Sequence, residues 1–294
     1  MQKNRNLIEA LLFILPALAI YLFYFILPIP TSFYFSLFNW DGISAVSNFI
    51  GFDNWVELFQ DPIVWKSFGN NVILIFASIL IQIPLGLMLG LLISSKLKGV
   101  RLYKLLYFLP MMIASVAIAM IWNLVFDPNF GLLNAILNSV GLEQFAMGWL
   151  GDPKLALGAI IGVVCWQFTP FYMVIFSAAL SGIPEEILEA AYLDGASKIQ
   201  TFFKITLPLL KSTVQVTMIL AITGSLRYFD LIFVMTGGGP NHASELLATY
   251  MYRQAFTSFR MGYGSTIAVF MLMIAFSITF LILRNRKQGI LYGE

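Results

Sequence analysis

Two charged residues lie close together in an apolar stretch of the sequence. The segment from Leu209 to Met235 contains Thr223, Arg227 and Asp230, at spacings of four and three residues. In a helix these spacings place the three side chains on one face. A guanidinium and a carboxylate in apolar surroundings are costly unless they pair with each other or meet water. They therefore indicate a structural ion pair, a proton-binding site or a contact point for a polar solute, and the sequence leaves these interpretations open.

Other chemistries have few candidate residues. Cys165 is the only cysteine and His242 the only histidine, so an internal disulfide and a cysteine-based metal cluster are excluded. His242 falls in a loop, where a solvated histidine is more common than a catalytic one. The sequence contains no G-x-x-x-x-G-K-[ST] motif, no dinucleotide fingerprint and no H-E-x-x-H motif. We therefore expect no catalytic residue, no metal site and no cofactor bound by this chain.

Composition indicates which elements must position the charged residues. Only 11% of the 294 residues are charged, whereas 59% are hydrophobic and 15% aromatic. So few charges cannot cover a water-soluble surface of ordinary size, which predicts an integral membrane protein. A hydrocarbon layer about 30 Å thick requires roughly 20 apolar residues in a helix. Six such blocks predict an all-α membrane domain over residues 1–294, with spans at about 11–37, 72–93, 105–126, 155–180, 209–235 and 264–283.

The distribution of lysine and arginine predicts the orientation. With loops assigned alternately, the side of the N-terminus receives Lys3, Arg5, Lys96, Lys98, Arg101, Lys104, Lys198, Lys204, Lys211, Arg284, Arg286 and Lys287, and the other side receives Lys66, Lys154, Arg253 and Arg260. By the positive-inside rule, both termini are expected in the cytoplasm. The net charge of +2 then reflects topology rather than nucleic-acid binding. The first apolar block continues far beyond the core of a signal peptide, so we expect it to be retained.

One loop between apolar blocks resembles part of a soluble protein. Residues 184–197 are predicted to form a short helix, with Ser181 as a possible cap and Pro184 in the first turn. Gly195 permits the left-handed turn that ends a helix. One face is apolar and the other acidic; the apolar residues are Ile187, Leu188, Ala191 and Tyr192, and the acidic ones Glu185, Glu186, Glu189 and Asp194. Acidic residues disfavour binding to an anionic membrane surface. The helix therefore either covers its own bundle or docks into a groove of a cytoplasmic partner.

This loop resembles a known signature. The residues Glu189-Ala190-Ala191, then Gly195, then Ile205-x-Leu207-Pro208 are similar to the EAA motif of permease subunits in bacterial ABC importers that depend on a binding protein. A second stretch, "FDLIFVMTGGGP" from Phe229 to Pro240, resembles carbohydrate-transporter permeases, and most of all the first of their two permease subunits. The resemblance covers nearly the whole chain and corresponds to the compact six-span form of the maltose-type permease.

The resemblance implies a set of partners. Such permeases work in the bacterial cytoplasmic membrane with a second homologous permease, two ABC ATPase subunits that bind ATP and Mg²⁺, and an external solute-binding protein. The EAA segment is their coupling helix, so Glu189 is expected to meet a basic ATPase residue. Ala190, Ala191 and Tyr192 would fill the ATPase groove, supported by Asp194, Gly195, Leu207 and Pro208.

The resemblance also implies where a sugar is bound. Sugar recognition combines aromatic faces with hydrogen-bonding groups. Trp166, Gln167 and Tyr172 supply these in "CWQFTPFY", and Ser225 and Tyr228 supply them in "GSLRYFD" beside Arg227 and Asp230. By resemblance, Trp166 stands at a sugar-stacking position. The alternatives are helix packing or a place in the aromatic belt at the membrane interface for Trp166, and an ion pair, internal or with the second permease, for Arg227.

Three classes of function follow from these observations. The leading one is a permease of an ABC importer for an oligosaccharide or related carbohydrate. A proton-coupled secondary transporter is the alternative, because Arg227 and Asp230 could form a proton site, although it has no need of an EAA helix. A membrane enzyme comes third, because no cluster of catalytic residues is apparent.

Overall fold

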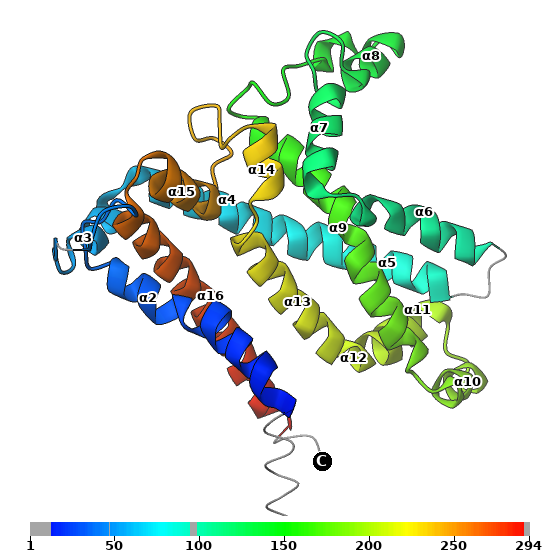
Figure 1. Ribbon diagram of the computed structural model, residues 1–294. Helices are drawn as coiled ribbons and strands as arrows, with labels where there is room; N and C mark the ends of the chain where they lie inside the picture. The colour runs from blue at the N-terminus through cyan, green and yellow to red at the C-terminus, as the bar shows by residue number, and fades with distance from the viewer. Residues whose placement is uncertain (1–12, 47, 95–98, 291–294) are drawn as a thin grey trace, which may run out of the picture. The chain divides into compact units, whose positions relative to one another are not determined.

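The chain is built from helices, as the apolar blocks predict. The computed structural model describes residues 13–46, 48–94 and 99–290. Within these ranges the only β-type pairing is an isolated bridge between Phe38 and Phe49, and Figure 1 shows helices throughout. The prediction of an all-α membrane fold is confirmed.

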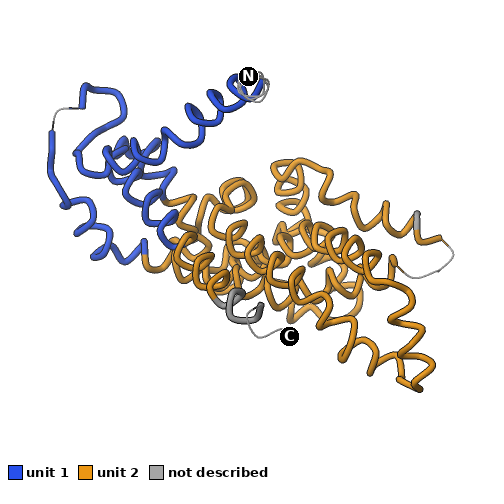
Figure 2. The backbone as a smooth tube through the Cα atoms, turned by 90° about the horizontal axis from the view of Figure 1, so that it is seen from below, with its two compact units in different colours: residues 1–64, 251–274 blue, residues 65–250, 275–294 orange. Residues whose placement is uncertain are grey.

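The chain divides into two compact units (Figure 2). The first consists of residues 1–64 and 251–274, and the second of residues 65–250 and 275–294. That both belong to one permease domain stays a prediction. The first unit contains η1 (Leu22–Ile26), α2 (Pro28–Phe35), α3 (Asp53–Gln60), η5 (Arg253–Thr257) and the beginning of α16 (Met261–Ile290). Here the Tyr263 hydroxyl donates to Asp61 Oδ2 at 2.7 Å, and the Gly262 N–H donates to the Trp40 carbonyl at 3.0 Å, which joins α16 to the residues around α2 and α3.

The second unit is arranged around a long helix, α9 (Ala156–Ser181). Helix α5 (Ile83–Ser94) lies against it, because Gly86 and Gly90 have no side chain at the contact. A Cβ atom at Gly86 would lie 2.5 Å from the Tyr172 Cβ. Two glycines one turn apart are a common way for membrane helices to approach closely. This approach fixes Tyr172, one of the candidate site residues, on α9.

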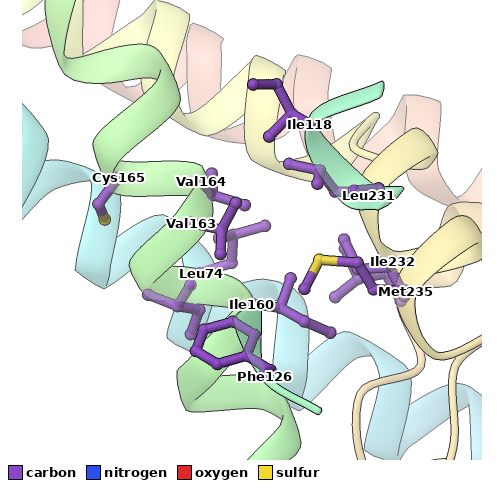
Figure 3. Close-up of a cluster of buried hydrophobic side chains, with 13 residues drawn as sticks. Leu74, Ile118, Phe126, Ile160, Val163, Val164, Cys165, Leu231, Ile232 and Met235 are labelled. Carbon is purple, nitrogen blue, oxygen red and sulfur yellow. The ribbon is translucent and has the colours of Figure 1, made fainter. Parts of the chain in front are cut away.

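A hydrophobic core joins α9 to shorter helices of the second unit. Figure 3 shows side chains of α9, among them Ile160 and Val163, facing those of Leu231 and Ile232 on α14 (Asp230–Met235). Further members come from α4 (Pro62–Ala77) and α7 (Ser115–Val125). The remaining helices of this unit are η2 (Ser78–Gln82), α6 (Val100–Met112), α8 (Leu132–Ser139), η3 (Glu143–Phe145), α10 (Glu185–Leu193), α11 (Lys198–Thr201), η4 (Phe202–Thr206), α12 (Leu207–Leu209), α13 (Lys211–Leu226), the greater part of α15 (Leu247–Tyr252) and the later part of α16.

Among the residues that the structure describes, five helical stretches are long and apolar enough to span a membrane. They are Phe13–Phe35, Pro62–Ser94, Ala156–Ser181, Lys211–Met235 and Met261–Arg284. The second begins ten residues before the predicted start at 72, and its first turns contain two asparagines, Asn70 and Asn71, that are buried and hydrogen-bonded within the protein. The helix therefore begins before the predicted span, and where the span itself begins stays a prediction.

The third predicted span, 105–126, is not one straight helix. It is a pair of helices, Leu102–Met112 and Ser115–Val125, that meet at an angle of 94°, and α7 turns away from α6 in Figure 1. Pro110 lacks the N–H of the last helical turn, and Ile113 and Ala114 adopt extended ψ angles of 138° and 135°. The predicted span at 105–126 is therefore a bent pair of helices, and that this pair crosses the membrane as one span stays a prediction.

Candidate functional site

A cavity of about 550 Å³ in the second unit lies where two helical stretches are broken. Met111 and Ser115 line it from either side of the break between α6 and α7. Arg227 and Asp230 line it from the break between α13 and α14. Broken helices leave backbone N–H and C=O groups without intrahelical partners. In membrane proteins such irregular backbone is tolerated where it is buried in protein or lines a cavity.

The break between α13 and α14 corrects one expectation. Thr223, Arg227 and Asp230 do not lie on one continuous helix, because α13 ends at Leu226 and α14 begins at Asp230. All three nevertheless line the cavity. The Arg227 Nε donates to the Thr223 carbonyl at 3.4 Å. Within the described residues, no ion pair joins Arg227 to Asp230.

The positions of the two charges have a local explanation. Arg227 follows the last residue of α13, where the helix dipole is negative, and Asp230 is the first residue of α14, where it is positive. Each charge therefore lies beside the helix end of opposite sign. Both side chains are exposed, so each keeps hydrogen-bonding capacity toward the cavity.

A buried asparagine holds the broken end of α13. Asn71 Nδ2 donates to the Ser225 carbonyl at 2.8 Å, and Asn71 Oδ1 accepts the Leu247 N–H at 2.9 Å. One side chain thus satisfies a carbonyl near the end of α13 and an N–H at the start of α15. This connection keeps Ser225, beside the cavity, in register with the loop that precedes α15.

The neighbouring residues of α4 anchor that loop. Asn70 Nδ2 donates to the carbonyls of Ala243 and Glu245 at 3.0 and 2.8 Å, and Lys66 Nζ donates to the Asn241 carbonyl at 2.7 Å. The sequence interpretation missed Lys66, Asn70 and Asn71. For the two asparagines, the sequence did contain a signal: two adjacent amides stand immediately before an apolar block. Amides exposed to lipid there would be unfavourable, which indicates that they are hydrogen-bonded within the protein.

Five of the predicted path residues line the cavity, namely Tyr172, Ser225, Arg227, Tyr228 and Asp230. The polar lining also includes Ser78, Gln82, Ser115 and Thr223, which the sequence interpretation did not select as path residues, although it placed Thr223 beside Arg227 and Asp230. The hydroxyls of Ser78 and Ser225 are 3.3 Å apart. The lining combines hydroxyl, amide and charged groups with the rings of Phe168, Phe171, Tyr172 and Tyr228, a mixture suited to a polar solute with apolar faces.

Trp166 and Gln167 lie outside this lining. Trp166 is 45% exposed, and its ring contacts that of Trp122 with centroids 5.5 Å apart. Gln167 is buried and its Nε2 donates to the Ile113 carbonyl at 3.5 Å, at the break that follows α6. Within this chain, Gln167 therefore supports the helix break, and a sugar-stacking role for Trp166 stays a prediction.

Tyr228 lines the cavity with its ring rather than with its hydroxyl. The hydroxyl oxygen is buried and has no hydrogen-bond partner among the described residues. The ring packs edge to face on Phe168, with centroids 5.7 Å apart. The expected hydroxyl contact beside a sugar is therefore not available in this conformation.

The predicted cytoplasmic helix is present as α10, and its end follows the expected pattern. Gly195 has a φ of 79°. The Ala196 N–H donates to the Ala191 carbonyl and the Gly195 N–H to the Tyr192 carbonyl, each at 3.0 Å, which is a Schellman motif. The prediction that Gly195 ends the helix is confirmed. Ser181 does not cap α10, because it is the last residue of α9 and its hydroxyl donates to the Ser177 carbonyl.

Only part of the predicted apolar face of α10 is exposed. Ala191 is 6% exposed and therefore covered by its own chain, so it does not belong to an open docking surface. Tyr192 and Leu193 are 80% and 84% exposed, and the sequence interpretation had missed Leu193. A shallow hollow on the helix surface is lined by Glu185, Leu188, Glu189, Tyr192 and Leu193.

The remaining predicted coupling residues lie on α10, at its end, or on α12. Ala190, Asp194 and Gly195 are exposed, and Pro208 is exposed in α12 beside the half-buried Leu207. In the part of the chain that the structure describes, no group of three His, Cys, Asp or Glu residues is arranged to hold a metal ion.

Comparison with known proteins gives a consistent picture. Residues 82–288 match the family model described as binding-protein-dependent transport system inner membrane component. The chain is 38% identical to the probable ABC transporter permease protein YurN of Bacillus subtilis, over 97% of this chain and 98% of that protein. It is 34% identical to the trehalose/maltose transport system permease protein MalF of Thermococcus litoralis, over 95% of this chain and 94% of that protein.

A solved structure shares the fold. A chain in the crystal structure of a bacterial ABC transporter involved in the import of the acidic polysaccharide alginate superposes with a TM-score of 0.83 at 23% identity. The match covers 97% of this chain and 96% of that chain.

Proposed function

The chain belongs to the family of inner membrane components of binding-protein-dependent transport systems, and from this premise we propose that it is a permease subunit that imports a carbohydrate, such as a disaccharide or short oligosaccharide. The observation that carries the proposal is the cavity at the two helix breaks. Its lining brings together exposed Arg227 and Asp230, the hydroxyl of Ser225 and the ring of Tyr172. The trehalose/maltose permease at 34% identity supports a sugar as the solute.

The chemistry of the lining fits a neutral polyhydroxy solute. Arg227 and Asp230 add one positive and one negative charge, so the charged lining residues contribute no net charge. A carboxylate accepts hydrogen bonds from sugar hydroxyls, a guanidinium donates to them, and an aromatic ring covers the C–H face of a pyranose. A second, homologous permease would complete the path, and an external solute-binding protein would deliver the sugar to it.

The driving force would come from outside this chain. Two ATPase subunits would bind ATP and Mg²⁺ on the cytoplasmic side, where both termini of the permease are also expected. Helix α10 would dock there through Tyr192, Leu193 and the carboxylate of Glu189, which are exposed on its surface. Closure of the ATPase dimer would then move α10 and shift the helices around the cavity between outward-open and inward-open arrangements.

The test is transport by the reconstituted complex. The chain is co-expressed with the second permease, the ATPase and the binding protein of its own gene cluster, and placed in proteoliposomes. Uptake of radiolabelled maltose, trehalose and maltotriose is expected to require both internal ATP and external binding protein. Uptake of these sugars driven by a proton gradient without ATP would instead support a secondary transporter. Absence of any carbohydrate uptake would overturn the proposal.

A further inference from the structure

Gln82 is a buried amide at the cavity whose hydrogen-bonding capacity is almost unused. It is 2% exposed and lines the cavity beside Ser78. Within the described residues, its only side-chain hydrogen bond runs from Nε2 to the Cys165 Sγ at a distance of 3.7 Å. A primary amide offers two donors and one acceptor oxygen, whereas a thiol is a weak partner for either. Most of the capacity of Gln82 is therefore left for a group inside the cavity.

The backbone that carries Gln82 is π-helical, which affects the direction in which its side chain projects. Residues Ser78–Gln82 form a π-helical turn, η2, between the α-helices α4 and α5. A π-turn inserted in an α-helix changes which side chains share a face, and such turns are frequent at functional sites. Here Ser78 and Gln82, the first and last residues of the turn, both line the cavity.

A close helix–helix contact at Gly86, one turn after Gln82, restricts the position of Gln82. Gly86 packs directly against Tyr172 of α9, so the helix that carries Gln82 has little freedom to rotate or withdraw. Polar groups in protein interiors are nearly always hydrogen-bonded. The free amide groups of Gln82, which lines the cavity, would therefore be paired by what occupies that cavity.

We propose that Gln82 is a specificity-determining residue that recognises one hydroxyl group of the carbohydrate in the cavity. This rests on the proposed function as a carbohydrate permease. A hydroxyl both donates and accepts hydrogen bonds. A primary amide accepts through its oxygen and donates through its nitrogen, so it can bind a hydroxyl without any net charge. A solute that lacks this hydroxyl would leave the amide unpaired, which is how a polar site rejects a deoxy analogue.

The experiment compares parent sugars with their deoxy analogues. The complete transporter in proteoliposomes, with ATP inside and a saturating amount of its binding protein outside, takes up maltose or trehalose and each of their monodeoxy analogues. The ratio of uptake rates, parent over analogue, is measured for the wild type and for Gln82→Met, which keeps the length of the side chain and removes the amide. The wild type and Gln82→Met are assayed with the same binding protein. Any preference of the binding protein between parent sugar and analogue therefore affects both uptake ratios equally and cancels when they are compared.

The wild type is expected to prefer the parent sugar at one hydroxyl position by at least about tenfold, and Gln82→Met is expected to reduce that one preference to about twofold or less. The Cys165→Ala variant is the matched control, because it removes the weak thiol partner and keeps the amide. It is expected to retain the wild-type preference. Gln82→Leu replaces Gln82→Met if the latter does not assemble into the complex.

Any other outcome contradicts the proposed recognition role of Gln82. Equal ratios in the wild type and Gln82→Met at every hydroxyl position, or an equal loss of uptake for all sugars, overturn the role of Gln82 and leave the proposed function standing. If Cys165→Ala has the same effect as Gln82→Met, the amide serves helix packing instead. If the wild type takes up no carbohydrate with ATP, the proposed function is overturned, and the recognition role with it.

Discussion

The side-chain amide of Asn71 donates to the backbone carbonyl of Ser225 at 2.8 Å, across 154 residues of sequence. This contact places a buried asparagine of the second span against the broken end of α13. It shows that the interruption beside the cavity is part of the folded structure, because its backbone polarity is satisfied by a defined partner.

Replacing Asn71 is expected to destabilise the protein. Asn71→Ala leaves both the Ser225 carbonyl and the Leu247 N–H without their partner in a buried position, which costs about 1 to 3 kcal/mol for each such group. Thermal unfolding in detergent should show a lower midpoint. Asn138→Ala is the control, because Asn138 is exposed on α8, and it should unfold like the wild type. Equal unfolding of both variants would contradict the structural role of Asn71.

Arg227 and Asp230 are expected to act independently. No ion pair joins them in the described structure, and each lies beside the helix end that favours its charge. Arg227→Gln and Asp230→Asn should each reduce sugar uptake, and the double variant should not recover it. In a double-mutant cycle on stability, the coupling energy should stay below about 0.5 kcal/mol. Rescue of uptake in the double variant would mean that the two charges form a pair.

Removing the hydroxyl of Tyr228 is expected to be harmless. The oxygen is buried and has no partner in the described part of the chain, so Tyr228→Phe removes a polar group that the fold does not use. The unfolding midpoint should stay the same or rise, and uptake should be retained. Tyr228→Ala should lower both, since it removes the ring that packs on Phe168. A large loss of uptake in Tyr228→Phe alone would indicate that the hydroxyl turns into the path during transport.

Reversing the charge of Glu189 is expected to uncouple transport. Glu189 is exposed on α10, so Glu189→Lys should not disturb the fold, but it places a positive charge against the basic ATPase residue expected there. Uptake should fall at least about tenfold, while the thermal midpoint is unchanged. Glu143→Lys makes the same reversal in η3, where Glu143 is also exposed, and should transport normally. Normal uptake by Glu189→Lys with an intact ATPase complex contradicts the coupling role of α10.

Gly195 is expected to be replaceable only by residues that accept a positive φ. Its φ of 79° is costly for a residue with a Cβ atom, by about 1 to 2 kcal/mol, and least so for asparagine. Gly195→Val should disrupt the end of α10 and abolish ATP-dependent uptake, while Gly195→Asn should keep much of it. Because α10 lies at the surface, the global unfolding midpoint should change little in either variant. The idea fails if Gly195→Val transports as well as Gly195→Asn.

The sequence by itself determined that this is a helical membrane protein and where most of its spans lie. That information is local, because a span needs a long apolar run and hydropathy over such a run is independent of the neighbours. The end of α10 at Gly195 was equally predictable, since a left-handed turn is a property of the residue itself. The EAA residues from Glu189 to Pro208 indicated the family for the same reason, as they form one continuous segment.

Only the tertiary structure decided how these spans are broken and what faces the cavity. Hydropathy is an average over many residues, so it did not detect the interruptions at Ile113–Ala114 and after Leu226. A break is tolerated where its backbone groups are buried in protein or line a cavity, and here distant side chains satisfy some of these groups, as Asn71 does for Ser225 and Gln167 for Ile113. Helical spacing likewise did not predict that Ala191 is covered, that the Tyr228 hydroxyl is buried or that Trp166 lies outside the cavity. These facts depend on which helix packs against which face, and that is set by contacts such as Gly86 with Tyr172, between residues far apart in the chain.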